Sequence, residues 1–330
     1  MEYVQNPALP GMHLPFEWKG TPVDDHGRFV NYEFPHRYSL MEVLKWKFQR
    51  NPQKAAKQTE VWNPPVDHDE SFIHSGDDCI VWLGHATFFI RLGGVNILID
   101  PVFYNIPLIK RHVPFPIDPG HLTGLDYVLI SHNHLDHCDK RSLQLVAEQN
   151  PGVTYLSGLK MEGLLSHFTG SEKIQTAGWY QQYLTDDRIR IYYLPARHWT
   201  KRGLRDENIQ LWGAFVLQAG GKTIYFAADS GYGSHFADAG RIFPEIDYCI
   251  IGIGAYKPEW FMSQSHVSPA NAVKGANDMH ARVMVPMHYG TFDLADEPMG
   301  DPIAVLHDLE QQRSIDGRLE SRKIGEKLPI

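Results

Sequence analysis

The alternation of apolar and polar residues predicts a chain built mainly from strands after an irregular N-terminal stretch. Short apolar runs cover 79–84, 86–92 and 95–100, and Gly93 and Gly94 between the last two are typical of a hairpin turn. Further apolar runs predict strands at 125–131, 188–196, 211–218, 222–229, 246–254 and 281–287. Hairpins first and helix–strand alternation later indicate two sheets packed on each other, with helices outside.

Two helices are predicted among the later strands. Residues 139–150 have helical spacing of their apolar positions, and Pro151 and Gly152 end that segment. The second helix begins after Ser268, a favourable N-cap residue, with Pro269 at its first position.

Residues 1–75 are rich in proline and aromatic residues and show weak periodicity, which favours an arm that packs on the core. The one helix candidate in the arm is 38–53, where apolar residues such as Val43 and Leu44 recur at helical spacing. We therefore divide the chain into an arm, 1–75, and one domain, 76–330. The arm is a candidate for building a hydrophobic groove or a homodimer contact.

Composition excludes several classes of protein. The 330 residues carry a net charge of −8 without a long run of Lys or Arg, so tight nucleic-acid binding is not favoured. Cys79, Cys138 and Cys249 are far apart, which predicts reduced thiols in a cytoplasmic protein. We expect no secretory signal, and no apolar run approaches the roughly 20 residues that span a bilayer. A peripheral membrane contact stays open.

Histidine and aspartate gather in HNHLDH at 132–137, directly after a predicted strand. In an extended loop, side chains two residues apart point the same way, so His132 and His134 can face one ion. Asp136 and His137 follow where the chain turns and can face a second ion. Imidazole and carboxylate suit zinc, with manganese or iron as competitors. The alternative is a polar surface loop.

Three more candidate ligands, His198, Asp229 and His288, each stand at the end of a predicted strand. A rigid scaffold would hold ligands at such ends while the loops leave room for substrate. Alone, His198 or His288 would more often be an ordinary surface or core histidine. Their common placement, in a chain that already carries the motif, favours metal ligation.

The motif HNHLDH resembles the metal-binding motif of the metallo-β-lactamase superfamily. Eight blocks resemble, in order, the N-acyl-phosphatidylethanolamine-hydrolysing phospholipase D family: WLGHATFFI (82–90), ILIDPVF (97–103), LISHNHLDH (129–137), PARHWTKR (195–202), LWGAF (211–215), FAADSGY (226–232), GAYKPEWFMSQSHVSP (254–269) and MHYGTF (287–292). These blocks cover most of 80–295, while the arm, 145–190 and the C-terminus match less distinctly.

The resemblance implies a four-layer αββα sandwich, which agrees with the two packed sheets, and a hydrolase domain over 76–330. It implies one metal ion held by His132, His134, His198 and Asp229, and a second held by Asp136, His137, His288 and again Asp229. The implied cofactors are two Zn²⁺, with Mn²⁺ or Fe²⁺ as alternatives. The implied reaction is phosphodiester hydrolysis of the phospholipase D type on N-acyl-phosphatidylethanolamine-like phospholipids, through a metal-bridging hydroxide.

Asp136 and His266 are the catalytic candidates. His266 precedes the cap residue Ser268, and the resemblance places it beside the substrate phosphate, where it would bond the phosphoryl group or protonate the leaving oxygen. A structural histidine is the alternative. Asp100 and His85 are candidates for orienting the ligands. The alternatives are that Asp100 only initiates a turn before Pro101 and that His85 is only a buried histidine.

Tyr256, Trp260 and Phe261 are candidates for lining the substrate pocket, although such aromatic residues more often belong to a core. The substrate would be a phospholipid or another small molecule. An alternative with the same fold and metals is a lactonase or other ester hydrolase, resembling L-ascorbate-6-phosphate lactonases. A metal-binding protein without turnover is a third hypothesis, which the complete set of seven candidate ligands disfavours.

Overall fold

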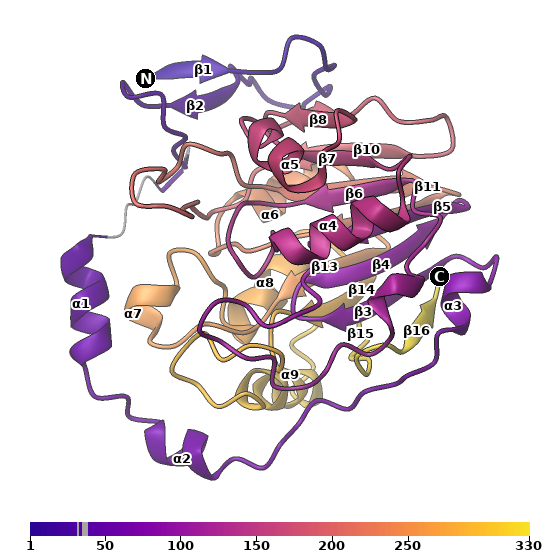
Figure 1. The fold of residues 1–330 in the computed structure, drawn as a ribbon. Helices are drawn as coiled ribbons and strands as arrows, with labels where there is room; N and C mark the ends of the chain where they lie inside the picture. The colour runs from indigo at the N-terminus through magenta and orange to yellow at the C-terminus, as the bar shows by residue number, and fades with distance from the viewer. Residues whose placement is uncertain (32, 35–38) are drawn as a thin grey trace.

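The computed structural model describes residues 1–31, 33–34 and 39–330, and its body is two facing β-sheets with helices on their outer faces (Figure 1). The first sheet has the order β16-β3-β4-β5-β6-β7-β8. Its strands are β3 (Cys79–Gly84), β4 (Thr87–Leu92), β5 (Val95–Ile99), β6 (Tyr127–Ile130), β7 (Thr154–Gly158), β8 (Ile174–Ala177) and β16 (Lys327–Pro329).

The second sheet has the order β15-β14-β13-β12-β11-β10-β9. Its strands are β9 (Gln181–Gln182), β10 (Arg190–Leu194), β11 (Ala214–Ala219), β12 (Lys222–Phe226), β13 (Tyr248–Gly252), β14 (Val283–Met287) and β15 (Arg318–Leu319). Each sheet has an antiparallel half, β3-β4-β5 or β10-β11-β12, and a parallel half that continues from its last strand.

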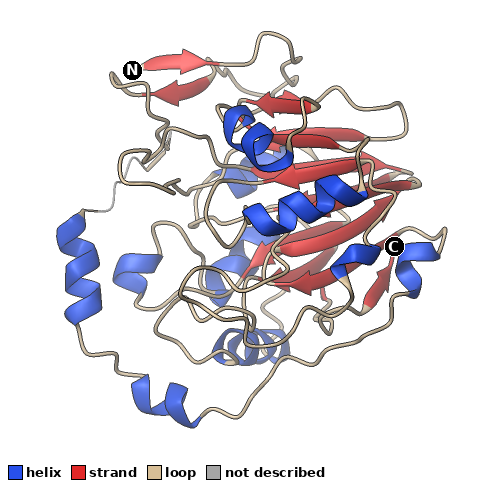
Figure 2. Ribbon diagram, viewed as in Figure 1, coloured by secondary structure: helices blue, strands red, loops and turns tan. Residues whose placement is uncertain are grey.

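Helices cover both outer faces, as Figure 2 shows. The helices of the domain are α4 (Lys140–Gln149), α5 (Glu162–Thr169), α6 (His235–Ile242), α7 (Glu259–Met262), α8 (Pro269–Asp278) and α9 (Asp301–Gln311), with a short 3₁₀ turn at Pro119–His121. The predicted four-layer αββα fold is therefore confirmed. In the part of the chain that the structure describes, no helix is long and apolar enough to cross a bilayer.

Burial on both faces explains why the strands appear in the sequence as continuous apolar runs. In β3, Ile80 and Trp82 belong to the core cluster shared with the second sheet. Val81 and Leu83, which point the other way, belong to the cluster formed with α4 and α5. Each predicted strand is present within a few residues of its expected bounds, and Gly93 and Gly94 form the β4–β5 turn with positive φ.

Both predicted helices of the domain are present, and the second has its predicted cap. Asp139 caps α4 by accepting from the N–H of Ser142, and Ser268 caps α8 by accepting from the N–H of Asn271. Sequence periodicity did not reveal β7, β8 or α5, which lie within 145–190, one of the stretches that match the family less distinctly.

The arm contains β1 (Glu2–Val4), β2 (Thr21–Val23), α1 (Leu40–Phe48), α2 (Lys54–Thr59) and α3 (Ser71–His74). The helix predicted over 38–53 is shorter, because α1 ends at Phe48 and Gln49 is extended. Pro52 also disfavours helical backbone at the residue before it. Its predicted first residue, Tyr38, lies outside the described residues. The division of the chain after residue 75 stays a prediction.

Candidate metal centre

The candidate ligands lie at the carboxyl ends of strands from both sheets. The motif 132–137 follows β6, His198 follows β10, Asp229 follows β12 and His288 follows β14. The carboxyl ends of parallel strands lie at the same edge of a sheet. The corresponding edges of the two sheets lie together here, and all seven predicted ligands gather there in two clusters.

Sharp backbone turns aim several of these side chains. His85, Asp100, Ala228 and His288 all have left-handed φ, at 54°, 42°, 52° and 63°. Non-glycine residues adopt this conformation rarely, and it costs of order 1–3 kcal/mol where it persists. Each of these residues directly follows a strand or adjoins a predicted ligand, so strained turns carry several side chains of the site.

The first cluster consists of His132, His134, His198 and Asp229. Nε2 of His132 and Nε2 of His198 lie 2.9 Å and 3.1 Å from Nδ1 of His134. Oδ2 of Asp229 lies 4.0 Å from Nε2 of His132 and 3.7 Å from Nε2 of His198. A ring nitrogen has either one lone pair or one N–H, so Nδ1 of His134 cannot bond both neighbours fully. A cation among the three nitrogens would satisfy all of them.

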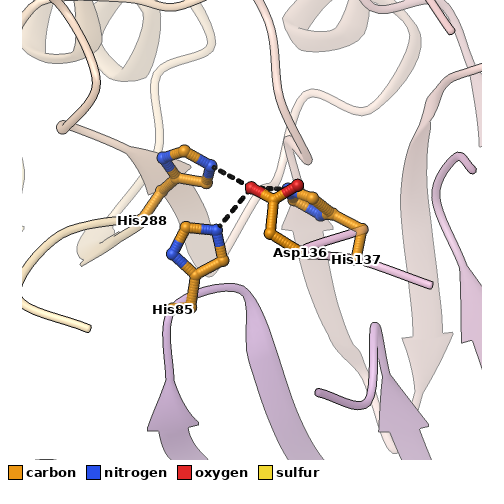
Figure 3. Close-up of side chains that lie close together, drawn as sticks. All are labelled: His85, Asp136, His137 and His288. Atoms are coloured by element: carbon orange, nitrogen blue, oxygen red, sulfur yellow. Dashed lines mark hydrogen bonds and ion pairs between the residues drawn. The ribbon is translucent and has the colours of Figure 1, made fainter. Parts of the chain in front are cut away.

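The second cluster consists of Asp136, His137, His288 and His85 (Figure 3). Oδ2 of Asp136 lies 3.6 Å from Nε2 of His288 and 3.7 Å from Nε2 of His137. The same oxygen accepts a hydrogen bond from Nε2 of His85 at 2.9 Å. His85, from the β3–β4 turn, therefore faces the site, and its side chain is also buried.

The carboxylate of Asp229 lies between the two clusters. Its Oδ2 lies 3.2 Å from Nε2 of His137, and its Oδ1 lies 3.1 Å from Nε2 of His288. Since Oδ2 also faces His132 and His198, Asp229 is placed where the predicted bridging role requires it.

Charge differs between the clusters. Burial lowers the pKa of His134 to about 4 and lowers the pKa values of His132 and His198 well below the usual range. Burial also opposes protonation of His137 and His288 in the second cluster. Asp229 nevertheless raises the pKa of His288 to about 9 and raises that of His137 well above its usual value. The three histidines of the first cluster are therefore neutral at pH 7, whereas His137 and His288 of the second cluster are protonated.

Unsatisfied nitrogen atoms provide an independent test of whether the site fits metal ions. Nε2 of His137 and Nε2 of His288 are buried and have no hydrogen-bond partner of good geometry. Buried polar atoms are rarely left in this state, and a cation that displaced the proton would satisfy each nitrogen. Both nitrogens face the carboxylates of Asp136 and Asp229, so the residues present fit a pair of cations with nitrogen and oxygen ligands.

Asp100 connects the two clusters. Its Oδ2 accepts from Nδ1 of His137 at 2.7 Å and from the hydroxyl of Ser131 at 2.6 Å. Nδ1 of His132 lies 2.9 Å from that hydroxyl oxygen. One buried carboxylate thus orients His137 directly and His132 through Ser131, leaving Nε2 of each ring facing the site.

Two further contacts hold the loops in place. Nη1 of Arg202 donates to the carbonyl oxygens of Asn133 and Cys138, at 2.9 Å and 2.8 Å, and so bridges the two ends of the motif loop. Nδ1 of His198 donates to the carbonyl oxygen of Ser265 at 3.0 Å. Neither contact can be found from the sequence, because a backbone acceptor leaves no residue signature.

His266 lies at the open side of the site. Its Nδ1 is 3.8 Å from Oδ2 of Asp229, and its side chain is 16% exposed while that of His288 is 1% exposed. His266 lines a small cavity of about 10 Å³ together with Asp229, Ser230 and His288. A cavity of this size holds about one water molecule, so it is a notch beside the clusters and does not enclose a substrate.

The three aromatic residues proposed for the pocket make their contacts elsewhere. The Tyr256 hydroxyl donates to Asp301, and the Phe261 ring stacks on Trp46 of α1 with centroids 5.0 Å apart. Trp260 lies under the ammonium group of Lys45. Phe261 and Tyr256 are buried, which agrees with the core alternative for both.

Comparisons with known proteins define the family. Residues 95–289 match the family model described as the β-lactamase superfamily domain. The chain is 31% identical to N-acyl-phosphatidylethanolamine-hydrolyzing phospholipase D 1 of Caenorhabditis elegans over 233 residues, 66% of this chain and 64% of the worm protein. It is 30% identical to a Mycobacterium tuberculosis protein of unstated function over 297 residues, 85% of this chain and 77% of that one.

Among solved structures, the fold is similar to that of Igni18, a metallo hydrolase from the archaeon Ignicoccus hospitalis, with a TM-score of 0.57 and 19% identity. The alignment covers 77% of this chain and 98% of that chain. The chain belongs to the metallo-β-lactamase superfamily. Its fold, family and two His/Asp clusters together are those of a metal-dependent hydrolase. The match with the worm enzyme spans less than two thirds of that protein's length.

Proposed function

We propose that the protein is a binuclear zinc hydrolase that cleaves phosphodiesters in the manner of a phospholipase D. The observation that carries the proposal is the placement of Asp229 between two clusters of nitrogen and oxygen donors. Zinc takes such ligands in hydrolytic sites, and Mn²⁺ or Fe²⁺ would compete for them. The substrate class we propose is phospholipids such as N-acyl-phosphatidylethanolamines, because the worm relative carries that activity in its name.

Each predicted ligand has a defined part in this proposal. His132, His134 and His198 would hold one ion, Asp136, His137 and His288 the other, and Asp229 both. When bound, the ions would supply hydroxide at neutral pH and neutralise charge on the phosphoryl oxygens. Nε2 of His85 donates to Oδ2 of Asp136 and so fixes how that carboxylate faces the second cluster.

His266 would act on the substrate rather than on the ions. Burial lowers the pKa of His266 to about 4, so its ring is neutral at pH 7. A neutral imidazole still has one N–H, which can donate to a phosphoryl oxygen as negative charge develops there. Its position on the cavity wall beside Asp229 gives it access to a group bound between the clusters.

A comparison of three substrates tests the reaction. The zinc-loaded protein would be assayed with a bis-aryl phosphodiester, an N-acyl-phosphatidylethanolamine in detergent micelles, and a lactone, each against the His132→Ala variant. The proposal expects turnover of both phosphodiesters and loss of that turnover in the variant. Turnover of the lactone alone would identify the carbonyl-directed alternative and exclude the phosphodiesterase. Two bound ions without turnover of any substrate would favour a binding protein.

A further inference from the structure

Helix α1 turns its apolar stripe toward solvent. Met41, Leu44 and Phe48 recur at positions i, i+3 and i+7 and are 75%, 40% and 84% exposed. In a helix these positions share one face. Surface helices of globular proteins normally pack such a stripe against the core, so the orientation of α1 is the reverse of the usual one.

Specific contacts on the opposite face fix this orientation. The Trp46 ring stacks on Phe261 of α7, and Nε1 of Trp46 donates to Oδ1 of Asp296 at 3.2 Å. Nδ2 of Asn51 donates to the carbonyl oxygen of Asp296 at 2.9 Å. Ser39 and Glu42 form a capping box at the start of the helix. The helix is thus formed and docked at the periphery of the molecule (Figure 1), with the apolar side chains of its stripe exposed.

The chain segment that carries the stripe is basic in an acidic protein. Lys45, Lys47, Arg50 and Lys54 are exposed, and the single acid between residues 40 and 54 is Glu42, whose carboxylate accepts from the N–H of Ser39. The whole chain has a net charge of −8. Exposed apolar side chains flanked by cations are the pattern of helices that lie in the interface of an anionic membrane.

The stripe also lies close to the candidate metal centre. Helix α7, against which α1 docks, leads directly to His266, whose backbone N–H donates to the carbonyl oxygen of Met262 at the end of α7. A surface that α1 touches would therefore lie near the open side of the site. The cavity there is only about 10 Å³, so the acyl chains of a lipid would have to remain outside it.

We propose that α1 is an interfacial helix that inserts Met41, Leu44 and Phe48 into the surface of an anionic phospholipid bilayer. A second copy of the chain is a poorer occupant, because three apolar side chains are far fewer than the roughly 20–30 residues per partner of a specific interface. The lipid contact does not depend on the proposed reaction. Together with that reaction, it would supply the substrate from the membrane.

Vesicle sedimentation tests the proposal without any assay of turnover. The wild-type chain and the Met41→Glu/Phe48→Glu variant would be mixed with vesicles of phosphatidylcholine and of equal parts phosphatidylcholine and phosphatidylglycerol. We expect wild type to sediment with the mixed vesicles and to bind the neutral vesicles more weakly. The variant should bind the mixed vesicles at least about tenfold more weakly, because it loses two apolar contacts and gains two negative charges. Arg50→Gln/Lys54→Gln should retain binding to neutral vesicles and lose the preference for anionic ones.

Val61→Glu is the matched control, because Val61 is 91% exposed in the same arm but lies outside the helices. It should bind like wild type, and all variants should hydrolyse a soluble bis-aryl phosphodiester equally if the proposed reaction holds. Equal vesicle binding by wild type and Met41→Glu/Phe48→Glu, or no binding by the folded wild type, would overturn the membrane role. So would a dimer in light scattering that the double variant abolishes, since a second copy would then cover the stripe.

Discussion

The carboxylate of Asp100 lies 2.7 Å from Nδ1 of His137, and the Ser131 hydroxyl extends the same contact to His132. One side chain thereby sets the ring orientation of an imidazole in each cluster. Such partners fix the tautomer of a ligating histidine and raise its basicity. Asp100 itself is held in a left-handed turn at the end of β5, which ties the geometry of both clusters to the rigid first sheet.

The Asp100→Asn variant should lose metal affinity at both clusters by about 10–100-fold. Asparagine tolerates left-handed backbone, so the turn should persist while the anionic acceptor is lost. Ser131→Ala is the matched variant, because it interrupts only the path to His132 and should weaken the first cluster alone. Zinc affinity would be measured by competition with a chelator. Unchanged affinity in Asp100→Asn would show that Asp100 has no orienting role.

Metal binding at the second cluster should weaken on acidification before binding at the first. Asp229 raises the pKa of His288 to about 9, so below that pH an ion must displace a proton from this ring. The raised pKa of His137 adds a second displaced proton. Each displaced proton lowers the apparent affinity by up to about tenfold per pH unit. In the first cluster burial lowers the pKa of His134 to about 4, and no proton is displaced near pH 7.

Equilibrium dialysis over about pH 8 to pH 5, followed by metal analysis, measures this difference. We expect one ion per chain to dissociate first and the other to persist to lower pH. The His134→Ala variant, which impairs the first cluster, should show only the more acid-sensitive binding. Loss of both ions in a single step at the same pH would contradict the assignment.

The Arg202→Gln variant should destabilise the loop that carries the motif. It removes hydrogen bonds from a charged donor to the carbonyl oxygens of Asn133 and Cys138, which should lower the free energy of unfolding by about 1–3 kcal/mol. Arg205→Gln is the control, because Arg205 is an exposed side chain three residues along the same loop. Urea unfolding of the metal-free proteins would measure both changes. Equal stability of the two variants would rule out the bridging role of Arg202.

The His266→Ala variant should retain both metal ions and lose about a hundredfold in kcat on a bis-aryl phosphodiester, because one donor to the phosphoryl group is removed. Metal content and kcat would be measured on the same preparation. His266 also lies within ligand distance of Asp229 and His288, so loss of an ion from this variant would identify it as a ligand. Full activity with full metal content would leave it a structural histidine.

The sequence predicts the strands that are buried on both faces of a sheet. Strands such as β3 and β4 are buried along their whole length and therefore appear as unbroken apolar runs. By contrast, β7 reads TYLSG and β8 reads IQTA, and tertiary neighbours rather than composition keep them in the sheet. α1 ends early because the chain meets Pro52, a local signal that the apolar spacing alone concealed.

For the site, residue type and strand ends are sufficient to find the seven predicted ligands, which the structure brings into two clusters. The sequence does not show which nitrogen of each ring faces inward, because that depends on Asp100, Ser131 and the Ser265 carbonyl group. It also does not show that α1 faces outward, since periodicity defines an apolar stripe but not what covers it.

The central claim is that the two clusters hold two metal ions around Asp229. Its most direct test is the metal content of the purified, zinc-equilibrated protein, measured by mass spectrometry against protein concentration. We predict two zinc ions per chain in wild type and one in the His134→Ala variant, which keeps the second cluster. One ion or none in the folded wild-type protein would contradict the binuclear centre.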